Sequence, residues 1–163
     1  MRPIDPATLL AQRLAVAVPA LLLGGAYISQ YVFGLFPCEM CWWQRYPHFV
    51  SLVLALVAAF APARHAGLRR GTIALAALAI LVSGLIGGFH AGVEYGWWEG
   101  ITGCASNVVS GGNALDNIMN APLVRCDVAP WSLLGISLAG WNFIISGAAA
   151  CAILALLSRR KAG

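Results

Sequence analysis

Four cysteines of this 163-residue chain fall into two pairs that could carry out thiol–disulfide chemistry. Cys38 and Cys41 form a C-x-x-C motif, whose small disulfide ring forms easily and opens easily. Cys104 and Cys126 stand 22 positions apart and bracket a segment rich in Gly, Asn and Ser. Two pairs on one face of a membrane could exchange disulfides by thiolate attack, or could be two structural bridges, and spacing alone does not decide between these alternatives.

The residues that follow the C-x-x-C motif would tune its second thiol. If a helix begins near Cys41, Arg45 lies one turn further along on the same face. A helix N-terminus and a guanidinium both stabilise a thiolate, so Cys41 is predicted to be more acidic and more reactive than Cys38. The alternative for Arg45 is an anchoring role, in which its charge extends from the edge of the hydrocarbon to lipid headgroups.

The cysteines are carried by a chain whose composition is that of a helical membrane protein. Hydrophobic residues make up 60% of the chain and charged residues only 10%, which excludes an ordinary soluble fold and a disordered chain. A hydrocarbon core about 30 Å thick needs roughly 20 apolar residues of helix. Four stretches meet this need, at about 14–36, 42–61, 72–89 and 131–157. The second is interrupted in its first turns by Gln44, Arg45 and His48.

The distribution of basic residues orients these four spans. Four spans put both termini on one side of the membrane and the loops 37–41 and 90–130 on the other. The side of the termini holds Arg2, Arg13, Arg64, Arg69, Arg70, Arg159, Arg160 and Lys161, and the loop side holds only Arg45 and Arg125. The positive-inside rule therefore predicts cytoplasmic termini, and the net charge of +4 reflects topology, with no support for nucleic-acid binding.

This topology predicts an all-α membrane protein, a bundle of four transmembrane helices forming a single domain over residues 1–163. Cys38, Cys41, Cys104 and Cys126 face the outer side, where disulfides persist, and Cys151 falls within the last span. No metal site is predicted. Cys38, Cys41 and His48 would supply three ligands, whereas zinc usually takes four.

The joint pattern resembles the DsbB-type disulfide bond formation proteins, which are quinone-dependent membrane thiol oxidases. The resemblance covers nearly the whole chain. It rests on the four spans, on the C-x-x-C motif followed by Gln44 and Arg45 between the first two, and on Cys104 and Cys126 between the last two. A related branch, similar to vitamin K epoxide reductase, uses a differently ordered bundle, and the position of the C-x-x-C motif here favours the DsbB order.

What the resemblance implies is an enzyme of the bacterial inner membrane, with its active cysteines on the periplasmic side. Its partner would be a soluble, DsbA-like protein of thioredoxin fold, whose dithiol it reoxidises before passing the electrons to a bound quinone, either ubiquinone or menaquinone. By position, Cys104 would form the mixed disulfide with that partner, and Cys126 would then pair with Cys38. Cys41 would be the thiolate that faces the quinone.

Three further residues are implied on the quinone side. Arg45, with Gln44 beside it, would lie next to the quinone ring and stabilise the negative charge that develops there. His90, at the end of the third span, is a candidate for the same site, and its alternative is an interfacial histidine paired with Glu94 at i+4. The rival hypothesis for the whole chain is a non-enzymatic four-span scaffold or transporter subunit with two structural disulfides.

Overall fold

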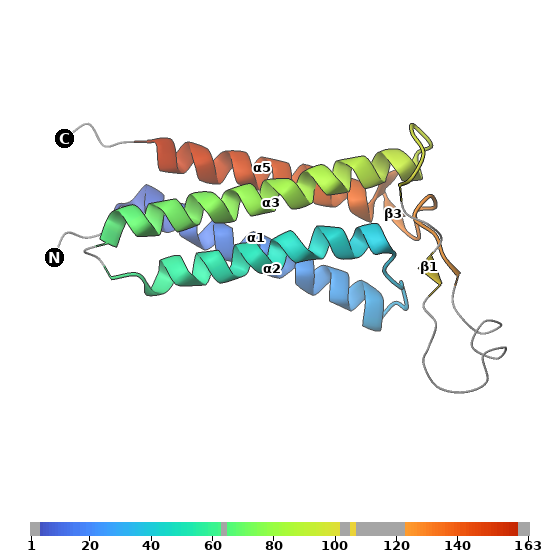
Figure 1. Cartoon of the computed structure of the whole chain (residues 1–163), viewed down its shortest axis with the longest axis horizontal. Helices are drawn as coiled ribbons and strands as arrows, with labels where there is room; N and C mark the ends of the chain where they lie inside the picture. The colour runs from blue at the N-terminus through green and yellow to red at the C-terminus, as the bar shows by residue number, and fades with distance from the viewer. Residues whose placement is uncertain (1–3, 63–64, 102–104, 107–122, 160–163) are drawn as a thin grey trace.

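A computed structural model describes residues 4–62, 65–101, 105–106 and 123–159 of the chain. Four long helices dominate it, namely α1 (Pro6–Tyr31), α2 (Glu39–Phe60), α3 (Ala66–Glu94) and α5 (Leu138–Ser158). The helices lie alongside one another. The first turn of α1 and the last turn of α5 are at one end of the bundle, and the first turn of α2 and the last turn of α3 are at the other (Figure 1). We call the second of these ends, which carries Cys38 and Cys126, the cysteine end.

Three of the helices are suited to crossing a membrane. α1, α3 and α5 are each long and apolar enough to do so. α2 has a sufficient 22 residues but is less apolar, because Gln44, Arg45 and His48 lie in its first three turns. The predicted helical membrane architecture is thus confirmed for three candidate spans, and the fourth predicted span is a helix of more polar composition.

The helix bounds differ from the predicted spans in ways that the local sequence explains. α1 begins at Pro6 because the Asp5 carboxylate accepts a hydrogen bond from the Thr8 backbone N–H, and it ends at Tyr31 before reaching residue 36. α3 continues beyond the predicted residue 89 to Glu94. The outer loop predicted at 90–130 therefore begins with a turn of helix.

The predicted start of the last span, at residue 131, is corrected by the structure. Strands β3 (Ser132–Leu133) and β4 (Ile136–Ser137) form a hairpin here, and α5 begins only at Leu138. Leu134 and Gly135, the two turn residues, have φ angles of 54° and 76°, the left-handed conformation that a tight type I′ turn requires. Ser137 then caps α5 by accepting a hydrogen bond from the Gly140 N–H at 3.1 Å.

Close packing around α3 holds the bundle together. α3 packs most extensively against α2 and α5, and α1 packs against α2 and α5. At Gly87 a Cβ atom would lie 2.9 Å from the Ala139 carbonyl oxygen and 3.0 Å from the Asn142 Nδ2 atom. The absence of a side chain at Gly87 thus permits the close approach of α3 and α5, as small residues commonly do in membrane bundles.

The segment between α3 and α5 is tied down at the cysteine end. Strand β1 (Ala105–Ser106) pairs antiparallel with β2 (Leu123–Val124), two residues before Cys126. Cys104, the residue before β1, lies outside the described residues. The Tyr95 hydroxyl, just after α3, accepts a hydrogen bond from the Ser137 N–H at 3.0 Å and so joins α3 to the hairpin.

The fifth cysteine, Cys151, is remote from Cys38, Cys41 and Cys126. It stands 13 residues beyond Leu138 in α5, which corresponds to about 20 Å along the helix, and its side chain is exposed on the surface of the bundle. We therefore expect Cys151→Ala to leave thiol oxidation within about twofold of the unsubstituted chain, measured as turnover per folded protein. A loss of turnover in a correctly folded Cys151→Ala protein would contradict this placement.

Candidate functional site

The C-x-x-C motif forms the N-terminus of α2. Cys38 is the N-cap residue, and its Sγ accepts a hydrogen bond from the Cys41 backbone N–H at 3.4 Å. The Cys38 thiol also donates to the Cys41 Sγ across 3.2 Å. The two sulfurs are therefore hydrogen-bonded thiols, close enough to form a disulfide with a small movement.

The shared hydrogen bond separates the acidities of the two thiols, both of which precede the predicted span 42–61. The hydrogen bond to Cys41 and burial raise the pKa of the Cys38 thiol to about 12. The hydrogen bond donated by Cys38 lowers the pKa of Cys41, and the charge of Arg45 acts in the same direction. Cys41 is thus the thiol that ionises first, which is the order the sequence predicts.

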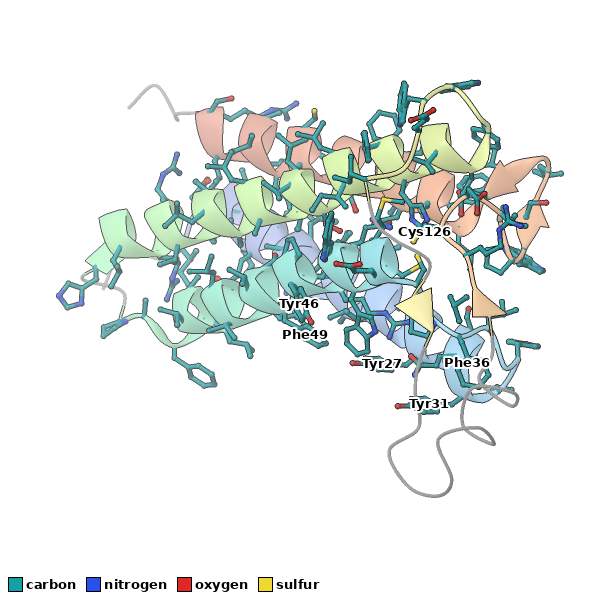
Figure 2. All side chains as sticks on the ribbon, turned by 45° about the vertical axis from the view of Figure 1, so that its right-hand side comes forward. Tyr27, Tyr31, Phe36, Tyr46, Phe49 and Cys126 are labelled. Atoms are coloured by element: carbon teal, nitrogen blue, oxygen red, sulfur yellow. The ribbon has the colours of Figure 1, made fainter. Side chains whose placement is uncertain are left out.

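Cys126 lies beside Cys38. The sulfurs of Cys38 and Cys126 and a ring nitrogen of His90 are all within 4.8 Å of one another. All three residues are buried, and Figure 2 shows Cys126 at the end of the bundle where α2 begins. The fold therefore juxtaposes a cysteine of the long loop with one of the short loop.

The same three residues are a grouping that could hold a metal ion, and it differs from the set considered from the sequence. The nearby ligand atoms belong to Cys38, His90 and Cys126, while His48 contacts Asn142. Three ligands fall short of the four that a structural zinc site usually has, and two of them are the sulfurs that exchange would require.

Arg45 points into the bundle. Its side chain is buried, donating from Nη1 to the Gln30 Oε1 atom at 2.7 Å and from Nη2 to the Ala26 carbonyl oxygen at 3.3 Å. The guanidinium also lies 4.9 Å from the ring centre of Tyr27 and 4.8 Å from that of Trp42. These contacts hold the charge against α1, toward the part of that helix where Figure 2 labels Tyr27 and Tyr31. This inward placement differs from that of a headgroup anchor.

Gln44 connects α2 to α3 and α5 and orients His90. The Asn142 Nδ2 atom donates to the Gln44 Oε1 atom at 2.8 Å, and the Gln44 Nε2 atom lies 2.9 Å from the His90 Nδ1 atom. Because an amide NH₂ can only donate, His90 Nδ1 is the acceptor, and the hydrogen of a neutral ring is on Nε2. That N–H faces the Cys38 Sγ at 3.6 Å and the buried Glu94 Oε1 atom at 3.8 Å.

His90 lies beside Glu94 at i+4, which is one of the two alternatives that the sequence left open, and its role on the quinone side stays a prediction. It also reaches Cys38 of the reactive pair, a contact that the sequence did not predict. Its position near the end of α3 is what makes this possible, because α3 continues one turn past it and is packed against the first turns of α2.

Asn142 also belongs to the site, although it was not predicted from the sequence. Its Nδ2 atom donates to Gln44 and to the Ser83 carbonyl oxygen, and its Oδ1 atom lies 3.1 Å from the His48 Nε2 atom. The available signal was an isolated amide within the long apolar run 131–157, since polar groups in membrane segments usually face the interior of a bundle.

A cavity of about 470 Å³ opens among α1, α2 and α5 next to these residues. Its volume is in the range of sites for small organic ligands. Apolar side chains form most of its wall, including Leu21, Leu35, Phe36, Trp131, Trp141 and Ile145. Its polar lining residues include Ser29, Cys41, Gln44, Arg45, His48, His90, Glu94 and Asn142. The cavity thus suits a mostly apolar ligand that carries a few polar atoms, beside Cys41.

Comparison with known proteins identifies the family of this chain. The family model described as "Disulfide bond formation protein DsbB" matches residues 9–156. A protein of Verminephrobacter eiseniae named "Disulfide bond formation protein B" is 34% identical over 92% of this chain and 85% of its own length. One of the same name from Azoarcus sp. is 32% identical over 87% of both chains. No solved structure matches significantly. The chain is therefore a member of the DsbB family of disulfide bond formation proteins, and disulfide-forming oxidoreductase activity is the role its family implies.

Proposed function

We propose that this protein is a membrane thiol:quinone oxidoreductase that reoxidises a periplasmic, DsbA-like dithiol oxidase. The observation that carries the proposal is the position of the C-x-x-C pair between two features. On one side Cys38 lies within 4.8 Å of the loop cysteine Cys126, and on the other side Cys41 and Arg45 line an apolar cavity. A pair placed in this way can take electrons from one partner and deliver them to another.

The cysteines would act by two successive exchanges. The partner's two thiols reduce a Cys104–Cys126 disulfide, which forms the partner's disulfide and leaves both loop cysteines as thiols. The Cys126 thiolate then attacks Cys38 of a Cys38–Cys41 disulfide, and Cys41 leaves as a thiolate beside the cavity. Attack of Cys104 on the resulting Cys126–Cys38 bridge restores the loop disulfide and releases Cys38 as a thiol. Two electrons and two protons have then left the partner.

The buried polar residues assist the second of these exchanges. The His90 Nε2–H faces the Cys38 Sγ, so it is placed to stabilise the negative charge that Cys38 acquires when its bridge to Cys126 opens. Gln44 holds the His90 ring in this orientation through Nδ1. Arg45 and the N-terminus of α2 stabilise the Cys41 thiolate.

The cavity fits a quinone, whose chemistry when bound is to accept the two electrons and two protons. The apolar wall would enclose the ring and the start of its isoprenoid chain, and Arg45 would place positive charge near a ring oxygen. Gln44 and His90, which the resemblance assigns to the quinone side, also line the cavity and support the proposal. Its lining does not distinguish ubiquinone from menaquinone, because both rings carry two opposed oxygens.

A quinone sink is required on energetic grounds. A DsbA-type partner has a reduction potential near −120 mV and is a strong oxidant. Reoxidising it with a less oxidising disulfide is uphill by about 1.4 kcal/mol for every 30 mV. The exchange steps would therefore stall unless the Cys38–Cys41 pair were oxidised continuously.

We further propose that all four helices span the bacterial inner membrane as one domain, with the termini cytoplasmic and the cysteine end periplasmic. The basic residues on described parts of the chain support this orientation. Arg69 donates to the Ala58 carbonyl oxygen at 3.2 Å and Arg70 to Leu157, at the end of the bundle opposite the cysteines. α2 is the least apolar of the four, and the buried contacts of Gln44, Arg45 and His48 would keep those polar groups away from lipid.

The test of this function is coupled turnover with purified protein. A reduced DsbA-type partner and a short-chain ubiquinone or menaquinone are mixed with catalytic amounts of the protein, while quinone absorbance and partner thiols are followed together. We expect one quinone consumed per disulfide formed. The rival scaffold hypothesis expects no quinone consumption, no quinone extractable from the purified protein, and disulfides that resist mild reductant.

A substitution in the loop pair tests the separate role of Cys126. Cys126→Ser should abolish oxidation of the protein partner, because electrons can no longer pass from the loop to Cys38. Oxidation of a small dithiol such as dithiothreitol should continue within about threefold, since it can attack the Cys38–Cys41 disulfide directly. Equal loss with both reductants would contradict separate roles for the two pairs.

A further inference from the structure

One of the residues that line the cavity is a histidine whose Nδ1 atom has no partner among the described residues. His48 is buried at 3% exposure and lines the cavity two turns further along α2 than Cys41. Its Nε2 atom contacts Asn142, but its Nδ1 atom is buried with no hydrogen-bond partner in the part of the chain that the structure describes. An unpaired polar atom in such a place is costly unless a ligand satisfies it.

The surrounding hydrogen bonds determine which kind of partner His48 can take. Asn142 uses its NH₂ group to donate to Gln44 and Ser83, so its Oδ1 atom is an acceptor. An oxygen that accepts must receive a hydrogen, and the His48 ring therefore carries its hydrogen on Nε2. Nδ1 of the neutral ring is then a bare acceptor. The Ser146 hydroxyl, which donates to the same Asn142 Oδ1 at 2.9 Å, reinforces this orientation.

We infer that His48 and Asn142 form a second oxygen-binding subsite, in which the His48 Nδ1 atom accepts a hydrogen bond from a ring hydroxyl of the reduced quinone. This inference rests on the proposed function. Arg45 is one turn from Cys41 along α2 and His48 is two turns from it, and both side chains line the cavity, so each would contact a different oxygen of one ring. A carbonyl oxygen has no hydrogen to offer, so the subsite favours the dihydroxy form over the oxidised form.

Preference for the reduced form has a consequence for the reaction. Binding the hydroquinone more tightly than the quinone makes the bound ring a stronger oxidant of the Cys38–Cys41 pair. A tenfold difference in the two affinities corresponds to about 30 mV for a two-electron couple. His48 would in this way act as a positioning residue that draws electrons out of the thiols, without touching either sulfur.

The test compares affinities for the two redox forms of one ligand. Ubiquinone with a single isoprenyl unit, and its hydroquinone, are titrated anaerobically by calorimetry into detergent-solubilised full-length protein. Every variant carries Cys41→Ala, so that neither form reacts with the protein. We expect His48→Leu to weaken hydroquinone binding about 3- to 10-fold, the usual effect of one hydrogen bond, and to change quinone binding less than twofold. His48→Gln, which keeps an acceptor, should retain part of the preference.

Ser51→Ala is the matched control, because Ser51 is one turn further along α2, fully buried and likewise unpartnered among the described residues, but does not line the cavity. It should leave both affinities unchanged. Equal weakening of both forms by His48→Leu would show that His48 only shapes the cavity and would overturn the inference. If the Cys41→Ala protein with His48 unchanged binds neither form, the proposed quinone function itself would be overturned.

Discussion

Replacing Cys41 with serine is expected to reduce coupled turnover by about 10³-fold or more while leaving the protein folded in the membrane. The Cys41 sulfur is the only one of the described cysteine sulfurs that lines the cavity. A serine hydroxyl can neither form the disulfide with Cys38 nor carry thiolate charge beside Arg45, so electrons could not leave the thiols. The measurement is quinone consumption with a reduced DsbA-type partner, normalised to folded protein by gel filtration.

A trapping experiment distinguishes loss of the quinone-facing thiol from general damage. Cys38 lies within 4.8 Å of Cys126, so a Cys41→Ser protein should still form the bridge between these two residues. Non-reducing peptide mapping would detect it. Cys151→Ala is the matched cysteine control, since its side chain is exposed on the surface of the bundle away from the cavity. Substantial turnover in the Cys41→Ser variant would end the relay model.

Much of this site could be predicted from the sequence because it depends on local spacing. Cys38, Cys41 and Arg45 belong to two consecutive turns of α2, and helix geometry alone puts Cys41 and Arg45 on one face. The greater acidity of Cys41 follows from the same short segment, because the Cys38 side chain caps the helix and donates to the Cys41 sulfur. Long apolar runs likewise made the existence of the four helices clear.

The parts that could not be predicted depend on contacts between distant segments. Nothing near Asn142 in the sequence indicates that it meets Gln44, 98 positions away, or that Gly87 allows α3 and α5 to approach closely enough for this. The hairpin ahead of α5 was missed because Trp131 to Leu138 is as apolar as the helix that follows. There the positive φ angles of Leu134 and Gly135 override a hydropathy pattern that indicated helix.

His90 makes one contact that the sequence predicts as an alternative and one that it does not. Pairing with Glu94 depends only on the spacing of two residues within α3. Contact with Cys38 requires the start of α2 to lie beside the end of α3. The structure satisfies both through one ring nitrogen, and Gln44 holds the other. A histidine that pairs with a residue of its own helix therefore also lies beside the reactive cysteine pair.

The second large effect is expected for Arg45→Met. This change removes a charge that is held against α1 by Gln30 and the Ala26 carbonyl, and it preserves most of the side-chain volume. We expect the kcat/KM for quinone to fall about 10²-fold, the usual consequence of removing one charge-stabilising donor from an active site. Exchange between the partner and the loop cysteines should remain within about threefold, because it takes place at Cys126 and Cys38.

Arg45→Lys separates charge from geometry. Lysine keeps the positive charge but cannot donate to Gln30 and Ala26 at once through a planar fork, so its quinone dependence should be intermediate. The measurement is steady-state oxidation of the reduced partner over a series of quinone concentrations, with the single-turnover exchange rate recorded separately. Unchanged quinone dependence in Arg45→Met would assign Arg45 to helix packing alone, because its buried contacts with α1, Tyr27 and Trp42 would then account for its presence without any ligand.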